Sequence, residues 1–263
     1  RKNINMKVKY EDLKNKRVFI TGGGSGLGAA TSAALVAAGA KVAILDQHYE
    51  SAQNTADKIG CLAIKCDVGS GDDAQKALEQ ARSAHGIPSI LVNCAGIGPG
   101  AAVVGKTGPV DLEWFEQTIR VNLTGTFNMI RLVAADMIKK ETSSEGEKGV
   151  IINTGSTSAY EGQVGQSAYA ASKAGVVGMG IALAREFARE GIRVMTISPG
   201  PFDTPLFESM PPKAYQRLLE SAQFPKRAGK PSEYAQLVTS IIQNPMLNGE
   251  SIRLDGAIRM GPR

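Results

Sequence analysis

This sequence is poor in the residues from which metal sites, disulfide frameworks and membrane spans are built. It holds three cysteines, an odd number that forms no disulfide framework, and only two histidines. No cysteine, histidine and carboxylate cluster has the spacing of metal ligands, so no metal is expected. No stretch reaches the roughly 18 apolar residues of a membrane span, and none resembles the core of a secretory signal. We therefore expect a soluble, intracellular protein that does not contact a membrane.

The net charge of +5 arises at one end of the chain. Residues 1–17 hold seven basic and two acidic side chains, which leaves the rest of the chain neutral. A basic arm alone is a weak argument for nucleic acid, and no such partner is predicted.

The chain does not begin with methionine and Met6 fits a start, so residues 1–13 are interpreted as an N-terminal arm or leader, with the origin of residues 1–5 left open. Residues 14–263 suffice for one large domain.

Short apolar segments alternate with long amphipathic segments along this domain. Such alternation is typical of a parallel, doubly wound α/β sheet, the Rossmann fold. No internal repeat and no domain linker interrupts the pattern. We expect strands near residues 17–21, 41–46, 61–65, 88–93, 149–154, 192–198 and 251–254, and helices near residues 26–38, 50–59, 70–85, 111–139, 167–190 and 231–243.

A glycine-rich turn, Gly22-Gly-Gly-Ser-Gly26-Leu-Gly28, follows the first predicted strand. Glycines permit a tight turn and let backbone amides approach a pyrophosphate at the N-terminus of the next helix. The alternative, a flexible turn, fits poorly between a buried strand and an alanine-rich helix. The cofactor contacts predicted in this turn are Gly22, Ser25, Gly26, Leu27 and Gly28.

Asp46 ends the second predicted strand, roughly 20 residues beyond the turn, where dinucleotide-binding units carry an acidic ribose ligand. Its carboxylate accepts hydrogen bonds from ribose hydroxyls but repels a 2′-phosphate, and Gln47 follows it instead of a base. The sequence therefore favours NAD over NADP as the cofactor. An N-cap for the following helix is the alternative role of Asp46.

A tyrosine and a lysine four residues apart define a second site. Tyr169 and Lys173 fall in a predicted helix, where this spacing puts both on one face. At about 5 Å and an effective dielectric of about 20, the ammonium favours the phenolate by about 3 kcal/mol, roughly two pKa units before desolvation. Tyr169 would then be a general base, while Ser156 holds the substrate oxygen as a hydride leaves the carbinol carbon. The spacing also occurs by chance, and the nucleotide-binding turn is what favours catalysis.

Together these motifs resemble the short-chain dehydrogenase/reductase family over about residues 14–259. Asn93-Cys-Ala-Gly96, Asn122 and Pro199-Gly200 add to the resemblance, while Cys94 departs from it because many members carry asparagine there. The resemblance implies the strand order 3-2-1-4-5-6-7. It also implies that Asn122 distorts its helix and binds a water through which the catalytic proton leaves; an exposed asparagine is the alternative. The further cofactor contacts that it implies are Asp67, Val68, Asn93, Ala95, Gly96, Tyr169, Lys173, Pro199, Gly200, Phe202 and Thr204.

Residues 149–154, 161–166 and 248–260 resemble a narrower group, the type II 3-hydroxyacyl-CoA dehydrogenases, which also oxidise hydroxysteroids. The resemblance predicts an NAD-dependent enzyme that interconverts a 3-hydroxyacyl-CoA and a 3-ketoacyl-CoA, as in fatty-acid β-oxidation. Substrate contacts are expected from Ser156, Gln163 and Tyr169. A hydroxysteroid dehydrogenase and an NAD-binding scaffold without turnover are the alternatives. The expected location is cytoplasmic, or the mitochondrial matrix if the source is eukaryotic.

Residues 202–224 are apolar and interrupted by prolines, and we interpret them as a lid over an apolar substrate pocket. Lys213, Arg217, Lys226 and Arg227 would suit the phosphates of coenzyme A, or would simply form a charged outer helix face.

Residues 100–107 match the P-loop pattern letter for letter, which makes an ATPase a competing hypothesis. A P-loop needs its Lys-Thr to open a helix, whereas Gly108 and Pro109 follow at once and disfavour one. We therefore interpret this segment as a surface loop. Ser156 lacks the G-x-S-x-G elbow of a serine hydrolase.

The helices predicted at residues 111–139 and 167–190 carry apolar residues over more than the stripe that one sheet face would cover. These residues include Phe115, Ile119, Met129, Val133, Met137, Val176, Met179, Ile181 and Leu183. Family resemblance implies that these helices pair between subunits and that Ile252 to Met260 form a second interface, which together give a homotetramer. The alternative is that the whole arc packs within one subunit.

Overall fold

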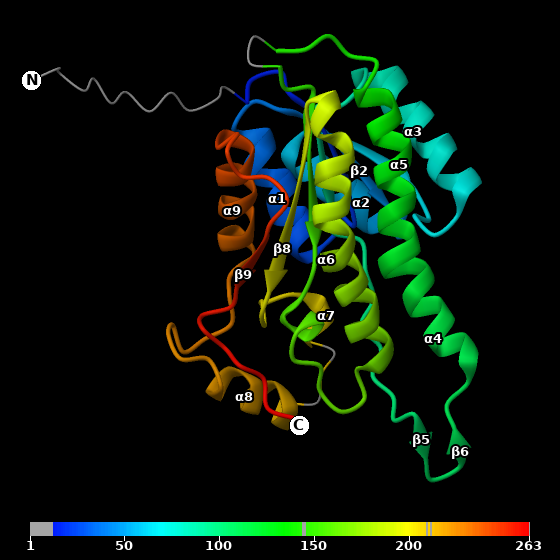
Figure 1. Ribbon diagram of the computed structural model, residues 1–263, viewed down its shortest axis with the longest axis vertical. Helices are drawn as coiled ribbons and strands as arrows, with labels where there is room; N and C mark the ends of the chain where they lie inside the picture. Colours follow the sequence, from blue (N-terminus) through cyan, green and yellow to red (C-terminus); the bar gives the residue numbers. More distant parts are fainter. Residues whose placement is uncertain (1–12, 144–145, 209, 211, 263) are drawn as a thin grey trace, which may run out of the picture.

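The computed structural model describes residues 13–143, 146–208, 210 and 212–262. Seven parallel strands form one sheet in the order β3-β2-β1-β4-β7-β8-β9 (Figure 1). They are β1 (Arg17–Thr21), β2 (Lys41–Asp46), β3 (Leu62–Lys65), β4 (Ile90–Asn93), β7 (Gly149–Thr154), β8 (Ile192–Pro199) and β9 (Ser251–Leu254). The predicted fold class and strand order are confirmed. Of the predicted N-terminal arm, all but Leu13 lies outside the described residues.

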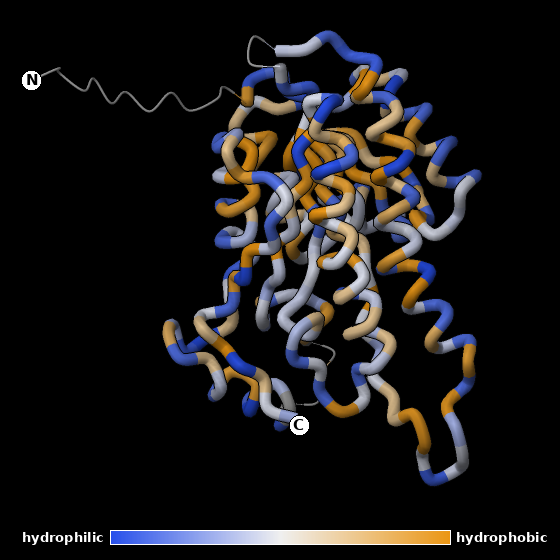
Figure 2. Tube along the Cα trace, in the orientation of Figure 1, coloured by the Kyte–Doolittle hydropathy of each residue, from blue (hydrophilic) through white to orange (hydrophobic). Residues whose placement is uncertain are grey.

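Helices cover both faces of this sheet (Figure 1). On one face lie α1 (Gly26–Ala37), α2 (Tyr49–Ile59) and α9 (Pro231–Gln243); on the other lie α3 (Gly71–His85), α5 (Gly125–Met137) and α6 (Ser167–Phe187). Side chains alternate along each strand, so Val18 and Ile20 pack toward the first layer and Phe19 toward the second. Figure 2 shows the resulting concentration of hydrophobic residues on the strands. No helix in the described part of the chain is long and apolar enough to cross a membrane.

Arg193 on β8 ties α9 to the sheet. Arg193 is 6% exposed, and its guanidinium donates hydrogen bonds to carbonyls at the carboxyl end of α9 and just beyond it, which would otherwise lack partners. Its Nε also pairs with Glu147 at 2.7 Å. The four accepting carbonyls are those of Ile241, Ile242, Asn244 and Leu247.

The helix predicted over residues 111–139 is divided by a wide turn. The structure has α4 (Leu112–Ile119), a π-helical turn (Arg120–Thr124) and then α5. The Asn122 side chain leaves its own helix to bond both backbone groups of Ile97 at 2.8 Å, and Gly125 packs so closely on Val68 that a Cβ would lie 2.6 Å from its Cγ2. The helical distortion expected at Asn122 is therefore present.

Residues 100–107 form no phosphate-binding loop. The segment enters a two-stranded hairpin, β5 (Val104–Gly105) with β6 (Gly108–Pro109), that projects from the body of the protein (Figure 1). Lys106 and Thr107 form the turn of this hairpin and do not open a helix, and Val104 is 72% exposed. The interpretation as a surface loop is confirmed.

Much of the apolar arc predicted to face a partner lies in the core instead. Five of its members are buried because α5 and α6 pack against the sheet and α3: Met129, Val133, Met137, Val176 and Leu183. Phe115 and Ile181 do reach the surface, joined there by Phe127 and Ile138. The exposed apolar face is thus real but narrower than the sequence pattern indicated.

Candidate active site

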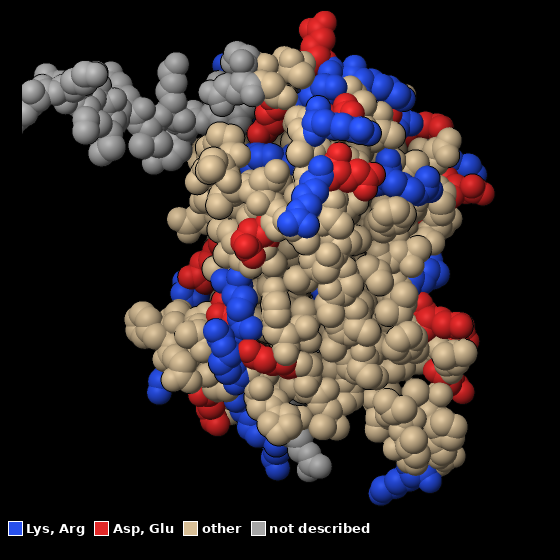
Figure 3. Space-filling view, viewed as in Figure 1, with Lys and Arg blue, Asp and Glu red and all other residues tan. Residues whose placement is uncertain are grey.

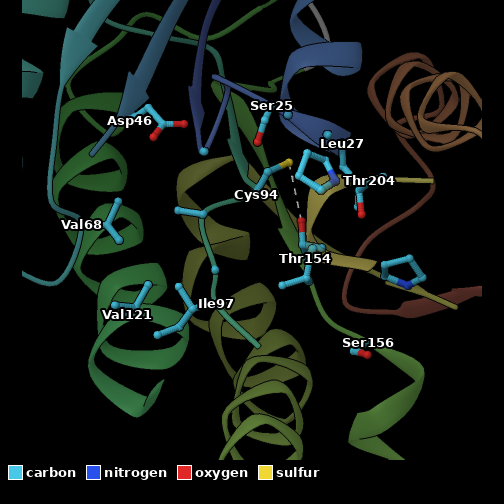
Figure 4. A pocket seen from close by; sticks show the side chains of 18 of the residues that line it. Ser25, Leu27, Asp46, Val68, Cys94, Ile97, Val121, Thr154, Ser156 and Thr204 are labelled. Carbon is cyan, nitrogen blue, oxygen red and sulfur yellow. Dashed lines mark hydrogen bonds between the residues drawn. The ribbon is translucent and has the colours of Figure 1, made fainter. Parts of the chain in front are cut away.

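A cleft of about 220 Å³ opens at the carboxyl ends of the central strands. In doubly wound sheets this edge is where ligands bind. Figure 4 shows Asp46 near one end of the cleft and Ser156 near the other, with Cys94 and Thr154 between them. Of the predicted site residues, the lining includes Gly22, Ser25, Gly26, Leu27, Gly28, Asp46, Asp67, Val68, Ala95, Gly96, Ser156, Tyr169, Lys173, Pro199, Gly200, Phe202 and Thr204.

The turn between β1 and α1 forms a cradle that only glycine can build. Gly22 has φ +65°, and a Cβ on it would lie 2.6 Å from the backbone nitrogen of Ala95. A Cβ on Gly28 would lie 2.2 Å from the carbonyl oxygen of Gly22. Helix α1 begins here with no acidic residue in its first turn and no side-chain cap from Ser25. Its amide groups and the positive end of its dipole therefore face the cleft, as a pyrophosphate requires.

Asp46 and Asp67 lie at the ends of neighbouring strands on one side of the cleft. The Asp46 oxygens accept hydrogen bonds from the backbone nitrogens of Gly24 and His48, both at 2.9 Å. Asp67 pairs with Arg120 at 2.8 Å and is thereby fixed beside Val68. These carboxylates suit the hydroxyl-bearing adenosine half of a dinucleotide and disfavour extra phosphate there.

Tyr169 and Lys173 lie one turn apart on α6, facing Ser156 across the other end of the cleft. The Lys173 Nζ is 5.8 Å from the centroid of the Tyr169 ring and donates to the Thr154 carbonyl at 2.8 Å. Ser156 lies two residues beyond the end of β7, is 6% exposed, and accepts a hydrogen bond from the Ser158 nitrogen at 3.1 Å. The predicted catalytic cluster of serine, tyrosine and lysine is therefore assembled.

The pKa of Tyr169 differs from the sequence expectation. Burial raises the pKa of the phenol, and the nearby Ser156 hydroxyl only partly opposes this shift. Burial likewise lowers the pKa of Lys173 from 10.5 to about 8. The sequence expectation was a fall of about two units caused by Lys173 before desolvation; in this structure burial is the largest influence on the pKa of Tyr169, and the Lys173 ammonium donates to the Thr154 carbonyl rather than to the phenol.

Three predicted site residues do not line the cleft. Asn93 is 3% exposed and donates through its amide to Asn153 at 2.9 Å. Asn122 also donates to the Ser172 hydroxyl at 3.0 Å, next to Lys173. The amide of Gln163 donates to the Gly261 carbonyl at 3.1 Å, so its expected substrate contact stays a prediction.

Cys94 lies beneath the centre of the cleft in a polar cluster of three side chains that the sequence did not reveal. The Thr154 hydroxyl is 3.7 Å from its Sγ (Figure 4) and 2.7 Å from the Tyr234 hydroxyl, which comes from α9. Burial raises the pKa of the Cys94 thiol. Other lining residues that sequence reasoning missed are Leu45, Gln47, His48, Cys66, Ile97, Val121 and Gly155, whereas Pro205, Leu206 and Phe207 fall within the predicted lid. Most adjoin a predicted residue; Ile97 and Val121 are brought in by the π-helical turn.

The predicted lid begins with α7 (Pro205–Glu208) and continues in α8 (Pro212–Glu220). Leu206 and Phe207 line the cleft, and a Cβ on Gly98 would contact both Leu206 and the Tyr169 ring. The guanidinium of Arg227 donates two hydrogen bonds to the Glu233 carboxylate, at 2.9 and 2.6 Å.

Among the described residues, no group of three or more histidine, cysteine or carboxylate side chains is placed to hold a metal.

Comparison with known proteins agrees with this geometry. The family model described as short chain dehydrogenase matches residues 16–214. The human 3-hydroxyacyl-CoA dehydrogenase type-2 is 49% identical over 265 residues, which cover 98% of this chain and 100% of the relative. The crystal structure of 3-hydroxyacyl-CoA dehydrogenase type-2 from Mycobacterium avium has a TM-score of 0.89 and 40% identity, with coverage of 95% and 98%. A 3-ketoacyl-(acyl-carrier-protein) reductase from Brucella melitensis, complexed with NADH, has a TM-score of 0.84 and 32% identity, covering 93% and 98%.

Proposed function

This chain belongs to the short-chain dehydrogenase family, and we propose that it is an NAD-dependent enzyme that oxidises 3-hydroxyacyl-CoA to 3-ketoacyl-CoA. The observation that carries the proposal is the placement of Ser156, Tyr169 and Lys173 at one end of a cleft whose other end suits a dinucleotide. A scaffold without turnover has no need of a buried lysine beside a phenol. The relatives named above supply the substrate class.

The residues at this end fit the removal of a proton from a secondary alcohol. The Ser156 hydroxyl holds the substrate oxygen, and Tyr169 accepts the proton from it. Lys173 stabilises the Tyr169 phenolate that takes up this proton and, with Asn122 behind it, leads the proton away. A bound nicotinamide supplies the acceptor for the hydride that leaves the same carbon, which completes the two-electron oxidation.

The glycine cradle would hold the pyrophosphate, and Asp46 would hold the adenosine ribose. Two properties support NAD over NADP: the Asp46 carboxylate at the ribose position, and Gln47 beside it in the lining where a base would be needed to neutralise a 2′-phosphate. Thr204 lies at the opposite end of the cradle, 3.2 Å from where a Cβ on Gly26 would stand, and suits the nicotinamide carboxamide.

A panel of secondary alcohols tests the substrate class. It contains 3-hydroxyacyl-CoA thioesters of increasing chain length and hydroxysteroids, and the appearance of NADH at 340 nm is the signal. We expect kcat/KM for at least one thioester to exceed that for every steroid. A preference for steroids would favour the alternative substrate, and no turnover of any alcohol would favour the scaffold.

We also propose that four chains assemble through two interfaces. Phe115, Phe127 and Ile181 form an apolar surface on α4, α5 and α6, and Figure 3 shows a broad face with few charged side chains in this region. Strand β9 is at the edge of the sheet, so its unpaired backbone groups can hydrogen-bond to a second copy of the chain. Light scattering should report about four times 27.7 kDa. A dimer would remove one interface from the proposal, and an active monomer would refute both.

A further inference from the structure

The C-terminal segment, residues 255–262, follows β9 and lies near the Ser156 end of the cleft. It packs on the loop of residues 157–166, which joins Ser156 to the helix of Tyr169. The Val164 nitrogen donates to the Pro262 carbonyl at 3.0 Å, and the Thr157 hydroxyl lies 3.8 Å from the Met260 sulfur. In Figure 1 the C-terminus lies at the same end of the molecule as α7 and this loop. The segment therefore forms a back wall for the residues that follow the catalytic serine.

Arg253 and Glu161 join the two segments. The Arg253 Nη1 and Nη2 atoms donate to the two Glu161 oxygens at 3.0 and 3.3 Å. Its Nε donates to Asp255 at 2.7 Å, and Nη2 also donates to the Ile258 carbonyl at 2.9 Å. Glu161 in turn accepts from the Met260 nitrogen at 2.9 Å. Both side chains of the pair are only 22% exposed.

This arrangement requires the planar fork of an arginine. All three guanidinium nitrogens of Arg253 are used, and its plane also lies over the Tyr160 ring, 5.3 Å from the centroid. A lysine would keep the charge but could not bond the loop and the C-terminal segment simultaneously. The pair thus fixes the position of one segment relative to the other, beyond contributing an ion pair.

We propose that Arg253 and Glu161 are positioning residues for substrate binding: they hold residues 255–262 against the loop of residues 157–166 and so set the wall next to Ser156. This inference rests on the proposed function. Among the described residues, the hydrogen bonds of residues 255–262 go to the loop of residues 157–166, to Arg253, to Gln223 and Phe224 at the end of the lid, or within the segment, and none reaches the glycine turn or Asp46. The pair should therefore govern the KM of the substrate and leave dinucleotide affinity unchanged.

Steady-state kinetics with 3-hydroxybutyryl-CoA and NADH binding by fluorescence test the proposal. Arg253→Met should raise KM at least tenfold while the Kd of NADH stays within twofold, and Arg253→Lys should resemble Arg253→Met more than the unmodified protein. The matched control is Arg82→Met, which removes an ion pair of similar exposure between α3 and the end of α5, at Asp136. This control should lose stability without a change in either constant.

A chain that ends at Ile258 provides a second variant, because it keeps Arg253 with Asp255 but loses the contacts of Met260 to Pro262. The same rise in KM is expected. In Glu161→Gln, hydrogen exchange at the amides of Val164 and Met260 should accelerate at least tenfold. An unchanged KM in both the Arg253→Met and the shortened chain, or a parallel loss of NADH affinity, would overturn the inference.

The two proposals can fail separately. If the unmodified protein does not oxidise the thioester, the proposed function fails, and unchanged exchange in Glu161→Gln would then overturn the positioning role as well. If the unmodified protein is active and only the kinetic split is missing, the positioning role alone is refuted.

Discussion

Replacing Lys173 with methionine should stabilise the protein while it abolishes turnover. Lys173 is 4% exposed, and burial lowers its pKa from 10.5 to about 8. Since one pKa unit corresponds to about 1.4 kcal/mol, the charged amine destabilises the folded state by about 3 kcal/mol. The bond to the Thr154 carbonyl offsets about 1 kcal/mol of this penalty. The free energy of unfolding of Lys173→Met should therefore exceed that of the unmodified protein by about 2 kcal/mol, or roughly 4–8 °C in Tm.

The gain should depend on pH in a defined window. Because the folded pKa of Lys173 is about 8 and the unfolded value is 10.5, the unfolded chain binds more protons between these values. The free energy of unfolding of the unmodified protein therefore gains a rising contribution with pH across this window, which Lys173→Met lacks. The advantage of the variant should be full below about pH 8 and should vanish or reverse by about pH 10.5.

Urea denaturation near pH 7 and near pH 10 measures both quantities. Lys139→Met is the control, since the Lys139 side chain is 70% exposed and its loss should change stability by less than about 0.5 kcal/mol. A Lys173→Met variant less stable than the unmodified protein near pH 7 would refute the reasoning from burial. A gain that does not change with pH would show that the charge is not its cause.

Three further outcomes are expected. Asp46→Ala with Gln47→Arg should narrow the excess of kcat/KM with NAD over that with NADP; equal use of the two cofactors by the unmodified protein would count against the ribose assignment. Gly28→Ala, whose Cβ would stand 2.2 Å from the Gly22 carbonyl oxygen, should weaken NADH binding by fluorescence at least tenfold, and tight binding would contradict the cradle. Because burial raises the pKa of Tyr169, kcat/KM for alcohol oxidation should rise up to tenfold per unit between about pH 7 and 9, whereas ketone reduction stays level; a flat oxidation profile would exclude this base.

The sequence predicted what short-range patterns encode. The strand that ends at Thr21, the glycine turn and the tyrosine-lysine spacing each depend on neighbouring residues, and the structure has all three. The distortion of the long helix at Asn122 was predicted. Its hydrogen bond with Ile97 was not, because the two positions meet only in the folded chain.

Properties that depend on packing were less accessible. Desolvation is the largest influence on the pKa of Tyr169, and the spacing of residues in a sequence does not reveal how deeply a side chain is buried. The apolar residues of α5 were predicted to face a partner subunit because hydrophobic periodicity does not show how many neighbouring elements a helix packs against. The contact between Cys94, Thr154 and Tyr234 joins three distant segments, and the Arg253–Glu161 pair joins the C-terminal strand to the substrate loop. Neither has a local signature.

The central claim is that the Tyr169 phenolate takes the proton during oxidation of a 3-hydroxyacyl-CoA, and turnover by Tyr169→Phe tests it most directly. The phenylalanine ring fills the same place on α6, so NADH should bind with a Kd within about threefold of the unmodified value. With 3-hydroxybutyryl-CoA and NAD, kcat should fall by about 100-fold or more, because only the proton acceptor is gone. Retention of more than about a tenth of the original kcat, with cofactor binding intact, would contradict the account.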